Sequence, residues 1–216
     1  VNPDDIKEHQ GIIANPNCST TIMVVAINPI YRAAGLKRVV VSTYQAVSGA
    51  GVAGLEELEE QVRSYVDGRP LQPKVFQHQI AFNLVPHIDV WVEKDYSKEE
   101  MHIDGLAVSP TAVRVPVFRS HAESINLETE RKITAAEARK VLSKAPGVIV
   151  VDNPQGNEYP MPWYTSNRDE VFVGRIREDI SLDKGLNLWV ASDQIRKGAA
   201  TNAVQIAEVV IRDSLF

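Results

Sequence analysis

The chain has 216 residues, of which 44% are hydrophobic and 24% charged, and its formal net charge is −5. These proportions are typical of a globular protein with a substantial core, and the negative charge disfavours nucleic acid or an anionic membrane as a partner. No apolar run is long enough to cross a bilayer, and the single cysteine cannot form an internal disulfide, so we expect a protein of the reducing cytoplasm.

Helical and strand patterns follow one another along the chain. Strands are indicated by β-branched residues and alternation, and helices by Ser or Thr at their starts and Gly after their ends. In chain order we expect a short buried strand at 11–15, a helix at 19–35, a strand at 36–47, a glycine-rich turn and helix at 48–68, loop and short strands at 70–93, a helix start at 97–102, one or two strands at 111–129, a helix at 134–147, strands at 148–153, 170–180 and 186–194, and a helix at 196–216. This order predicts an α+β fold built on a substantial, mostly antiparallel sheet. The glycines at 48–54 do not form a complete dinucleotide-binding fingerprint.

The only thiol, Cys18, follows Asn-Pro-Asn and stands at the expected start of a helix. Unpaired N–H groups and the helix dipole favour a thiolate there, and the same N–H groups can hold an oxyanion once sulfur has attacked a carbonyl. Asn17 could direct its amide at the same point. The alternative is that Cys18 is a small buried hydrophobe, as lone cysteines often are.

A thiol nucleophile usually works with a histidine base. Of the five histidines (9, 78, 87, 102 and 121), His121 is the best candidate because it follows "RVPVFRS" at the end of a strand pattern. Arg114 lies inside the apolar run "AVRVPVF", where a guanidinium is costly unless it meets an anion. That anion is either a substrate or a carboxylate of the protein itself.

Four motifs, "NPNCST", "STYQAVSGAG", "RVPVFRSH" and "SDQIRKGAATNAVQIAE", occur in an order that resembles bacterial aspartate-semialdehyde dehydrogenases. The resemblance covers nearly the whole chain. It implies a fold like the C-terminal domain of glyceraldehyde-3-phosphate dehydrogenase, with helices on one face of the sheet. It further implies a catalytic and dimerisation domain at 1–195 and a C-terminal helix at 196–216. That helix would pack on an NADP-binding domain that is missing here.

The resemblance also implies an activity, the reversible reductive dephosphorylation of L-aspartyl 4-phosphate to aspartate semialdehyde by NADPH, in the biosynthesis of lysine, methionine and threonine. Cys18 would be the nucleophile that forms a thioacyl intermediate, and His121 the general acid/base. The remaining roles implied are substrate binding by Asn17, Gln45, Glu99 and Arg114, and cofactor binding by Ser48, Gly49 and Gln194. No metal site is expected, since no cluster of His, Cys and Asp has ligand spacing.

The sequence departs from the family after "KEEM", where a lysine and a helix are expected. Here His102 stands in that place, so either a real deletion removed the helix or a segment is unobserved and His102 replaces nothing. Two other functions remain open: a non-catalytic dimerisation module whose thiol is a relic or redox sensor, and an enzyme of the N-acetyl-glutamyl-phosphate reductase type. We expect a homodimer, with little NADP-dependent turnover by these 216 residues alone.

Overall fold

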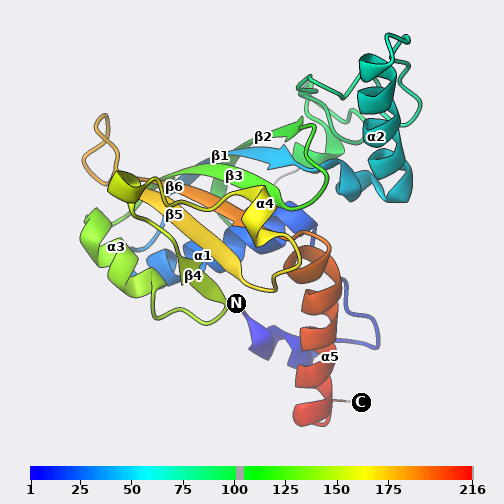
Figure 1. Ribbon diagram of the computed structural model, residues 1–216. Coiled ribbons are helices and arrows are strands. Elements are labelled where there is room, and N and C mark those ends of the chain that lie inside the picture. Colours follow the sequence, from blue (N-terminus) through cyan, green and yellow to red (C-terminus); the bar gives the residue numbers. More distant parts are fainter. Residues whose placement is uncertain (101–104, 216) are drawn as a thin grey trace.

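A six-stranded sheet forms the centre of the structure, a computed structural model that describes residues 1–100 and 105–215 (Figure 1). The strands are β1 (Arg38–Gln45), β2 (Ala107–Arg114), β3 (His121–Glu128), β4 (Val148–Val150), β5 (Val171–Glu178) and β6 (Gly185–Ser192). They lie in the order β2-β1-β3-β6-β5-β4. The three central pairings are antiparallel, whereas β2 and β4 pair in parallel at the two edges. The predicted α+β fold with a mostly antiparallel sheet is confirmed.

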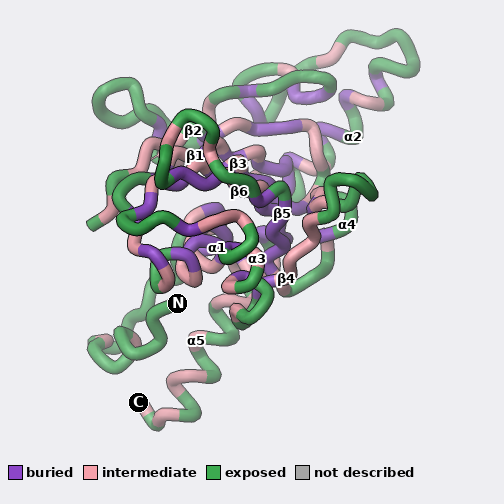
Figure 2. The backbone as a smooth tube through the Cα atoms, turned by 90° about the vertical axis from the view of Figure 1, so that its left-hand side faces the viewer, coloured by how far each residue is buried: buried purple, intermediate pink, exposed green. Residues whose placement is uncertain are grey.

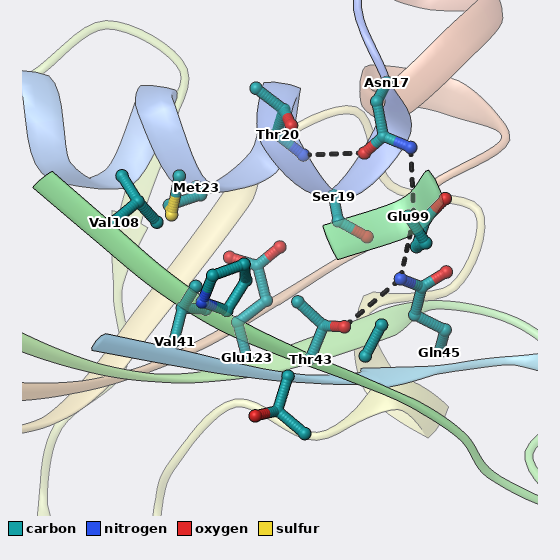
Figure 3. Close-up of a pocket in the computed structure, with 13 residues that line it drawn as sticks. Asn17, Ser19, Thr20, Met23, Val41, Thr43, Gln45, Glu99, Val108 and Glu123 are labelled. Carbon is teal, nitrogen blue, oxygen red and sulfur yellow. Dashed lines mark hydrogen bonds between the residues drawn. The ribbon is translucent and has the colours of Figure 1, made fainter. Parts of the chain in front are cut away.

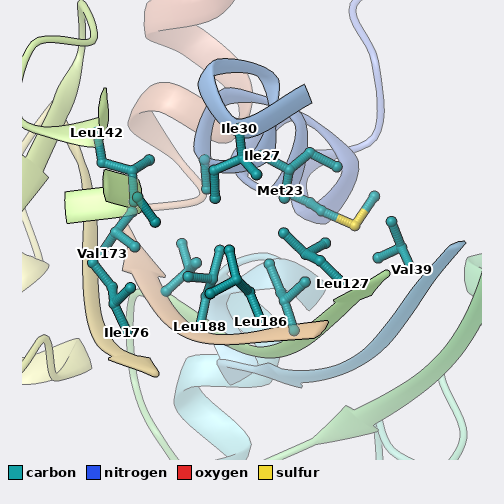
Figure 4. Packing of buried hydrophobic residues seen from close by; sticks show 14 of the residues in the cluster. Met23, Ile27, Ile30, Val39, Leu127, Leu142, Val173, Ile176, Leu186 and Leu188 are labelled. Atoms are coloured by element: carbon teal, nitrogen blue, oxygen red, sulfur yellow. The ribbon is translucent and has the colours of Figure 1, made fainter. Parts of the chain in front are cut away.

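The main core lies between one face of this sheet and two helices. The helices of the chain are α1 (Cys18–Ala34), α2 (Val52–Val66), α3 (Ala135–Leu142), α4 (Pro162–Thr165) and α5 (Thr201–Arg212). Side chains alternate along a strand, so every second residue of β1, β3 and β6 meets α1 and α3. Figure 4 shows Ile27 and Ile30 of α1 above Leu127, Leu186 and Leu188 of the sheet. The expected placement of helices on one face is therefore confirmed for α1 and α3.

The opposite face of the sheet is only partly covered. Tyr44 of β1 and Trp189 of β6 contact each other there, with ring centroids 5.5 Å apart. The Trp189 Nε1–H donates to the carbonyl oxygen of Pro160 at 2.8 Å, so the loop before α4 lies over part of this face. Other side chains of this face, such as Ser42 and Asn126, remain half-buried.

Helix α2 stands away from the sheet and has a small core of its own (Figures 1 and 2). Two of the buried side chains of α2 accept hydrogen bonds from the backbone of the following loop. Glu57 accepts a hydrogen bond from Lys74 N, and Gln61 accepts from Ile80 N and Ala81 N. These bonds hold an otherwise irregular segment beside the glycine-rich turn that precedes α2.

The prediction of a buried strand at 11–15 is wrong. These residues form no strand, and Ile12 is 89% exposed, because the described chain places no neighbouring strand beside them. The last helix is shorter than expected, since a π-helical turn at Arg196–Ala200 precedes α5, and no residue of α5 is buried. His102 and Met101 lie outside the described residues. Among the helices described, none combines the length and apolar character needed to span a membrane.

Candidate active site

Several candidate side chains meet at one end of the strands, where β1, β2 and β6 end and β3 begins. Parallel strands β1 and β2 end together, with Gln45 in register with Arg114. Antiparallel β3 begins with His121 at the same end of the sheet, and β6 ends there at Ser192, which pairs with His121. Gln45, Arg114 and His121, which are far apart in the sequence, are thereby brought to the same end of the strands.

The backbone just after β1 positions two of these side chains. The Ala46 N–H donates to His121 Nδ1 at 3.0 Å, and the Ala46 carbonyl oxygen accepts from Arg114 Nη1 at 2.8 Å. Gly49 closes over both, since a Cβ there would lie 2.8 Å from Arg114 Nη1 and 3.4 Å from His121 Nε2. Glycine is therefore needed at this position by the packing of the site.

His121 is 0% exposed, and the hydrogen bond from Ala46 determines its tautomer. A backbone N–H can only donate, so Nδ1 is the acceptor and the proton of the neutral ring is on Nε2. Burial, and secondly the charge of Arg114, hold the pKa of His121 well below its usual value. Nε2 has no hydrogen-bond partner among the described residues, so a neutral imidazole presents an N–H donor to the site.

Arg114 is only 7% exposed, its guanidinium donates to the backbone oxygen of Ala46, and it makes no ion pair with a carboxylate of the described chain. Burial lowers its pKa, and the charges of Glu99 and Cys18 act in the opposite direction. A buried guanidinium is costly without an anion. Of the two open possibilities, the structure therefore favours an anion from outside the described chain.

Cys18 is the first residue of α1, and Asn17 caps the helix by accepting a hydrogen bond from Thr20 N at 3.0 Å. Burial raises the pKa of the Cys18 thiol and the charge of Glu99 raises it further, whereas Ser19 and Arg114 lower it. The thiolate expected at a helix N-terminus is thus opposed by desolvation. Gly198 packs against this residue, since a Cβ there would lie 3.0 Å from Cys18 Cβ.

Glu99 joins the first turn of α1 to the end of β1 (Figure 3). Its Oε1 accepts hydrogen bonds from Asn17 Nδ2 at 3.0 Å and from Gln45 Nε2 at 2.9 Å. Gln45 Nε2 also donates to Thr43 Oγ1 at 3.1 Å, so both amide hydrogens of Gln45 are used and its oxygen is left to accept. The result is an anion held by two amides beside the thiol.

Ser48 and Gln194 also meet near this end of the strands. Gln194 Nε2 donates to Ser48 Oγ at 2.6 Å, and Gln194 Oε1 accepts from Ser120 N at 2.9 Å. The Ser48 hydroxyl keeps its own hydrogen for a further acceptor. Within the residues that the structure describes, no group of three or more His, Cys, Asp or Glu side chains could hold a metal ion.

Sequence reasoning missed two residues of this region. Ala46 acts only through its backbone, which leaves no signal in the sequence. Glu123 is fully buried two residues after His121 on the same face of β3. Glu123 occupies a position of the alternating strand pattern where an apolar residue is expected. This position was the signal that could have identified it.

Comparisons with known proteins show the family to which the chain belongs. The family model described as "Semialdehyde dehydrogenase, dimerisation domain" matches residues 27–197. An aspartate-semialdehyde dehydrogenase of Aquifex aeolicus is 58% identical over 230 residues, covering 100% of this chain and 67% of its own length. The chain belongs to the aspartate-semialdehyde dehydrogenase family.

Solved structures give the same result. The crystal structure of aspartate semialdehyde dehydrogenase II from Vibrio cholerae superposes with a TM-score of 0.95 at 45% identity, covering 99% of this chain and 67% of that one. A second structure of the Vibrio protein, described as complexed with ASA, has the same TM-score and identity. The chain thus spans about two thirds of the length of its relatives. The Aquifex alignment is longer than this chain of 216 residues, so that relative has residues without a counterpart here.

Proposed function

We propose that this chain carries the catalytic site of an NADP-dependent aspartate-semialdehyde dehydrogenase. The observation that carries the proposal is the group formed by a half-buried thiol, a neutral histidine and a buried arginine without a carboxylate partner in the described chain. The reaction is the reversible conversion of L-aspartyl 4-phosphate to aspartate semialdehyde and phosphate. It serves the biosynthesis of lysine, methionine and threonine.

In the direction of aldehyde oxidation, the Cys18 thiol releases its proton to solvent, and the thiolate adds to the carbonyl carbon. The carbonyl oxygen then develops negative charge, which Nε2–H of neutral His121 stabilises as a preorganised donor. Loss of hydride leaves a thioacyl group on Cys18. Phosphate then attacks the thioacyl carbon and displaces the Cys18 thiolate. His121 can take up a proton at Nε2 only in the tautomer that gives up the bond from Ala46, so the observed tautomer favours the donor role.

The two charged groups of the substrate, a carboxylate and an ammonium, would be bound by side chains of opposite charge. Arg114 has N–H groups left for a bidentate contact with the substrate carboxylate. Glu99 offers a carboxylate to the ammonium group, and Gln45 Oε1 accepts beside it. An acetylated nitrogen carries no positive charge, so Glu99 favours the aspartyl substrate over an N-acetyl-glutamyl one.

NADP supplies the hydride acceptor or donor when bound. The paired Ser48 and Gln194 fit a contact with the nicotinamide end, because the Ser48 hydroxyl can still donate to a carbonyl oxygen. Gly49 lies next to Ser48 and brings the backbone to the same place. These three residues would hold only one end of the cofactor.

The test is an assay of NADP reduction with aspartate semialdehyde and phosphate, using the full-length protein and Cys18→Ala, His121→Ala and Arg114→Lys. We expect no turnover without the thiol, a loss of about 10²–10³-fold in kcat without His121, and a raised KM for Arg114→Lys, which loses the bidentate contact. Turnover that survives Cys18→Ala, or faster turnover of the N-acetyl-glutamyl aldehyde, would reject the proposal.

We also propose that the protein is a cytoplasmic homodimer. The family model is that of a dimerisation domain, and the sheet face opposite α1 is only partly covered in a single chain. The Tyr44–Trp189 pair on that face is suited to contact a second copy.

A further inference from the structure

A cavity of about 40 Å³ lies beneath the first turn of α1, next to the proposed substrate site (Figure 3). It is large enough to hold at least one water molecule. Apolar side chains of α1 and β1, among them Met23 and Val41, form part of its wall, and Gln45 and Glu99 line it on the side of the active site. The cavity therefore connects the interior of the domain with the residues that would bind substrate.

Two buried polar side chains that line this cavity lack partners. Glu123 is 0% exposed, and neither of its carboxyl oxygens has a hydrogen-bond partner among the described residues. The Ser19 Oγ is also buried, and among the described residues it has no nitrogen or oxygen partner, although it lies close enough to the Cys18 thiol to lower its pKa. Figure 3 shows both side chains directed into the space between α1 and the sheet. Native proteins satisfy most such groups, with ordered water where no protein atom is available.

Burial raises the pKa of Glu123 well above its usual value, and no charged group of the described chain contributes to this shift. Burial thus favours the neutral form of this carboxyl group, which has one O–H donor and further acceptor capacity. It can thus exchange hydrogen bonds with water without leaving an unpaired buried charge.

Thr43 connects the cavity to the active site. Its Oγ1 accepts a hydrogen bond from Gln45, and its own hydrogen has no acceptor among the described residues. Gln45 in turn donates to Glu99, which also accepts from Asn17, the cap of α1. A water bound to Thr43 would therefore extend this network to the interior.

We propose that the cavity binds an ordered water that bridges Glu123, Ser19 and Thr43, and that Glu123 acts through it as a positioning residue for Gln45 and the first turn of α1. The water has at least three polar neighbours, as buried waters usually do. It joins β3, which carries His121, to the helix that carries Cys18. The inference rests on the proposed function in one respect, namely that Gln45 and Cys18 belong to the catalytic site. The water and its contacts can be observed whatever the substrate is.

The test compares the full-length protein with Glu123→Gln and Glu123→Leu, and Glu128→Gln serves as a control on the same strand but away from the cavity. Crystal structures that show ordered waters, and the rate of Cys18 alkylation by iodoacetamide at constant pH, are the two readouts. We expect the water in the parent and in Glu123→Gln, and its loss in Glu123→Leu. Alkylation should change about two- to tenfold in Glu123→Leu, as for the loss of one hydrogen bond. It should stay near the parent rate in Glu123→Gln and Glu128→Gln.

A dry cavity in the parent protein would overturn the inference, as would equal alkylation rates in all variants or a Gln variant that behaves like the Leu variant. If Glu123→Leu does not fold, Thr43→Val, which removes a hydroxyl at nearly constant shape, takes its place with the same expectation. Failure of the proposed function would instead appear as absent semialdehyde oxidation by the parent protein. The water and the alkylation rates can still be measured in that case.

Discussion

Ala46 shows how a residue without a functional side chain can organise an active site. Its N–H selects the tautomer of His121, and its carbonyl oxygen holds one end of the Arg114 guanidinium. The imidazole and the cation are thus held by one peptide segment, and Gly49 closes over both. A small displacement of this segment would move the imidazole and the guanidinium together.

The pKa of Cys18 is set by opposing neighbours. Glu99 raises it and Arg114 lowers it, in addition to the effect of burial. We predict that Glu99→Gln moves the pH profile of Cys18 alkylation to lower pH, and that Arg114→Ala moves it to higher pH. The rate of alkylation by iodoacetamide against pH measures both shifts. Shifts of the same sign in the two variants would show that their charges do not act on the thiol.

Glu123 should make stability depend on pH. Its folded-state pKa is raised, so the folded chain keeps a proton that the unfolded chain releases above a pH of about 4.3. The stability contributed by the neutral form is complete below that pH and is lost as pH rises toward the folded pKa, by at most about 1.4 kcal/mol per pH unit. Glu99 also lines the cavity, while Cys18 lies between the lining residues Asn17 and Ser19 in the chain, and His121 lies two residues before Glu123.

Glu123→Gln cannot ionise, so its melting temperature should rise relative to the parent between pH 5 and pH 8. Glu128→Gln, whose parent residue lies on the other face of β3 and meets Lys37, should not show this trend. A constant difference between parent and Glu123→Gln across this range would mean that Glu123 ionises normally.

Among the secondary-structure elements, the contact between the π-helical turn at Arg196–Ala200 and α1 determines where the thiol sits. Gly198 allows the two backbones to approach, and Cβ at this position would lie 3.0 Å from Cys18 Cβ. We predict that Gly198→Ala costs about 1–3 kcal/mol, as overpacked sites do, and changes the rate of Cys18 alkylation. Thermal unfolding and alkylation measure the two effects.

Helix α3 offers a control of similar stability cost. Thr134 and Glu137 form a reciprocal capping box at its start, which follows the end of β3 opposite to His121. Thr134→Ala should cost about 1 kcal/mol, or about 2–4 °C in Tm, without changing Cys18 alkylation. If both variants altered alkylation equally, the effect of Gly198→Ala would be general destabilisation.

For the whole molecule, the partly covered sheet face is the place to test dimerisation. Ser42 lies between residues whose side chains meet α1, so its own side chain is on the opposite face with Tyr44. We predict a dimeric mass by light scattering for the parent and at least about a tenfold weaker dimer for Ser42→Arg, which buries a charge at the contact. Ala136→Arg, on the exposed side of α3, should remain dimeric. A monomeric parent would reject this interface.

Patterns along the chain predicted most elements because caps and alternation act locally. The capping box of α3, the stop at Gly35 and the alternation of β1 and β3 all have the predicted form. The last helix was predicted but begins later than expected, after a π-helical turn, and the failure at residues 11–15 has a physical cause. An apolar pattern shows that a segment can bury a face, but it does not show what covers that face.

The sequence by itself determined the family and predicted the nucleophile and the side chains that accompany it, because four separated motifs occur in the order that this family shares. It could not determine which atoms meet. The tautomer of His121, the lack of an ion pair between Arg114 and a carboxylate of the described chain, and the burial of Glu123 each depend on neighbours supplied by other segments. Hydrogen bonding and desolvation act over a few ångströms in space, so only the tertiary structure, which brings distant residues to that distance, decided them.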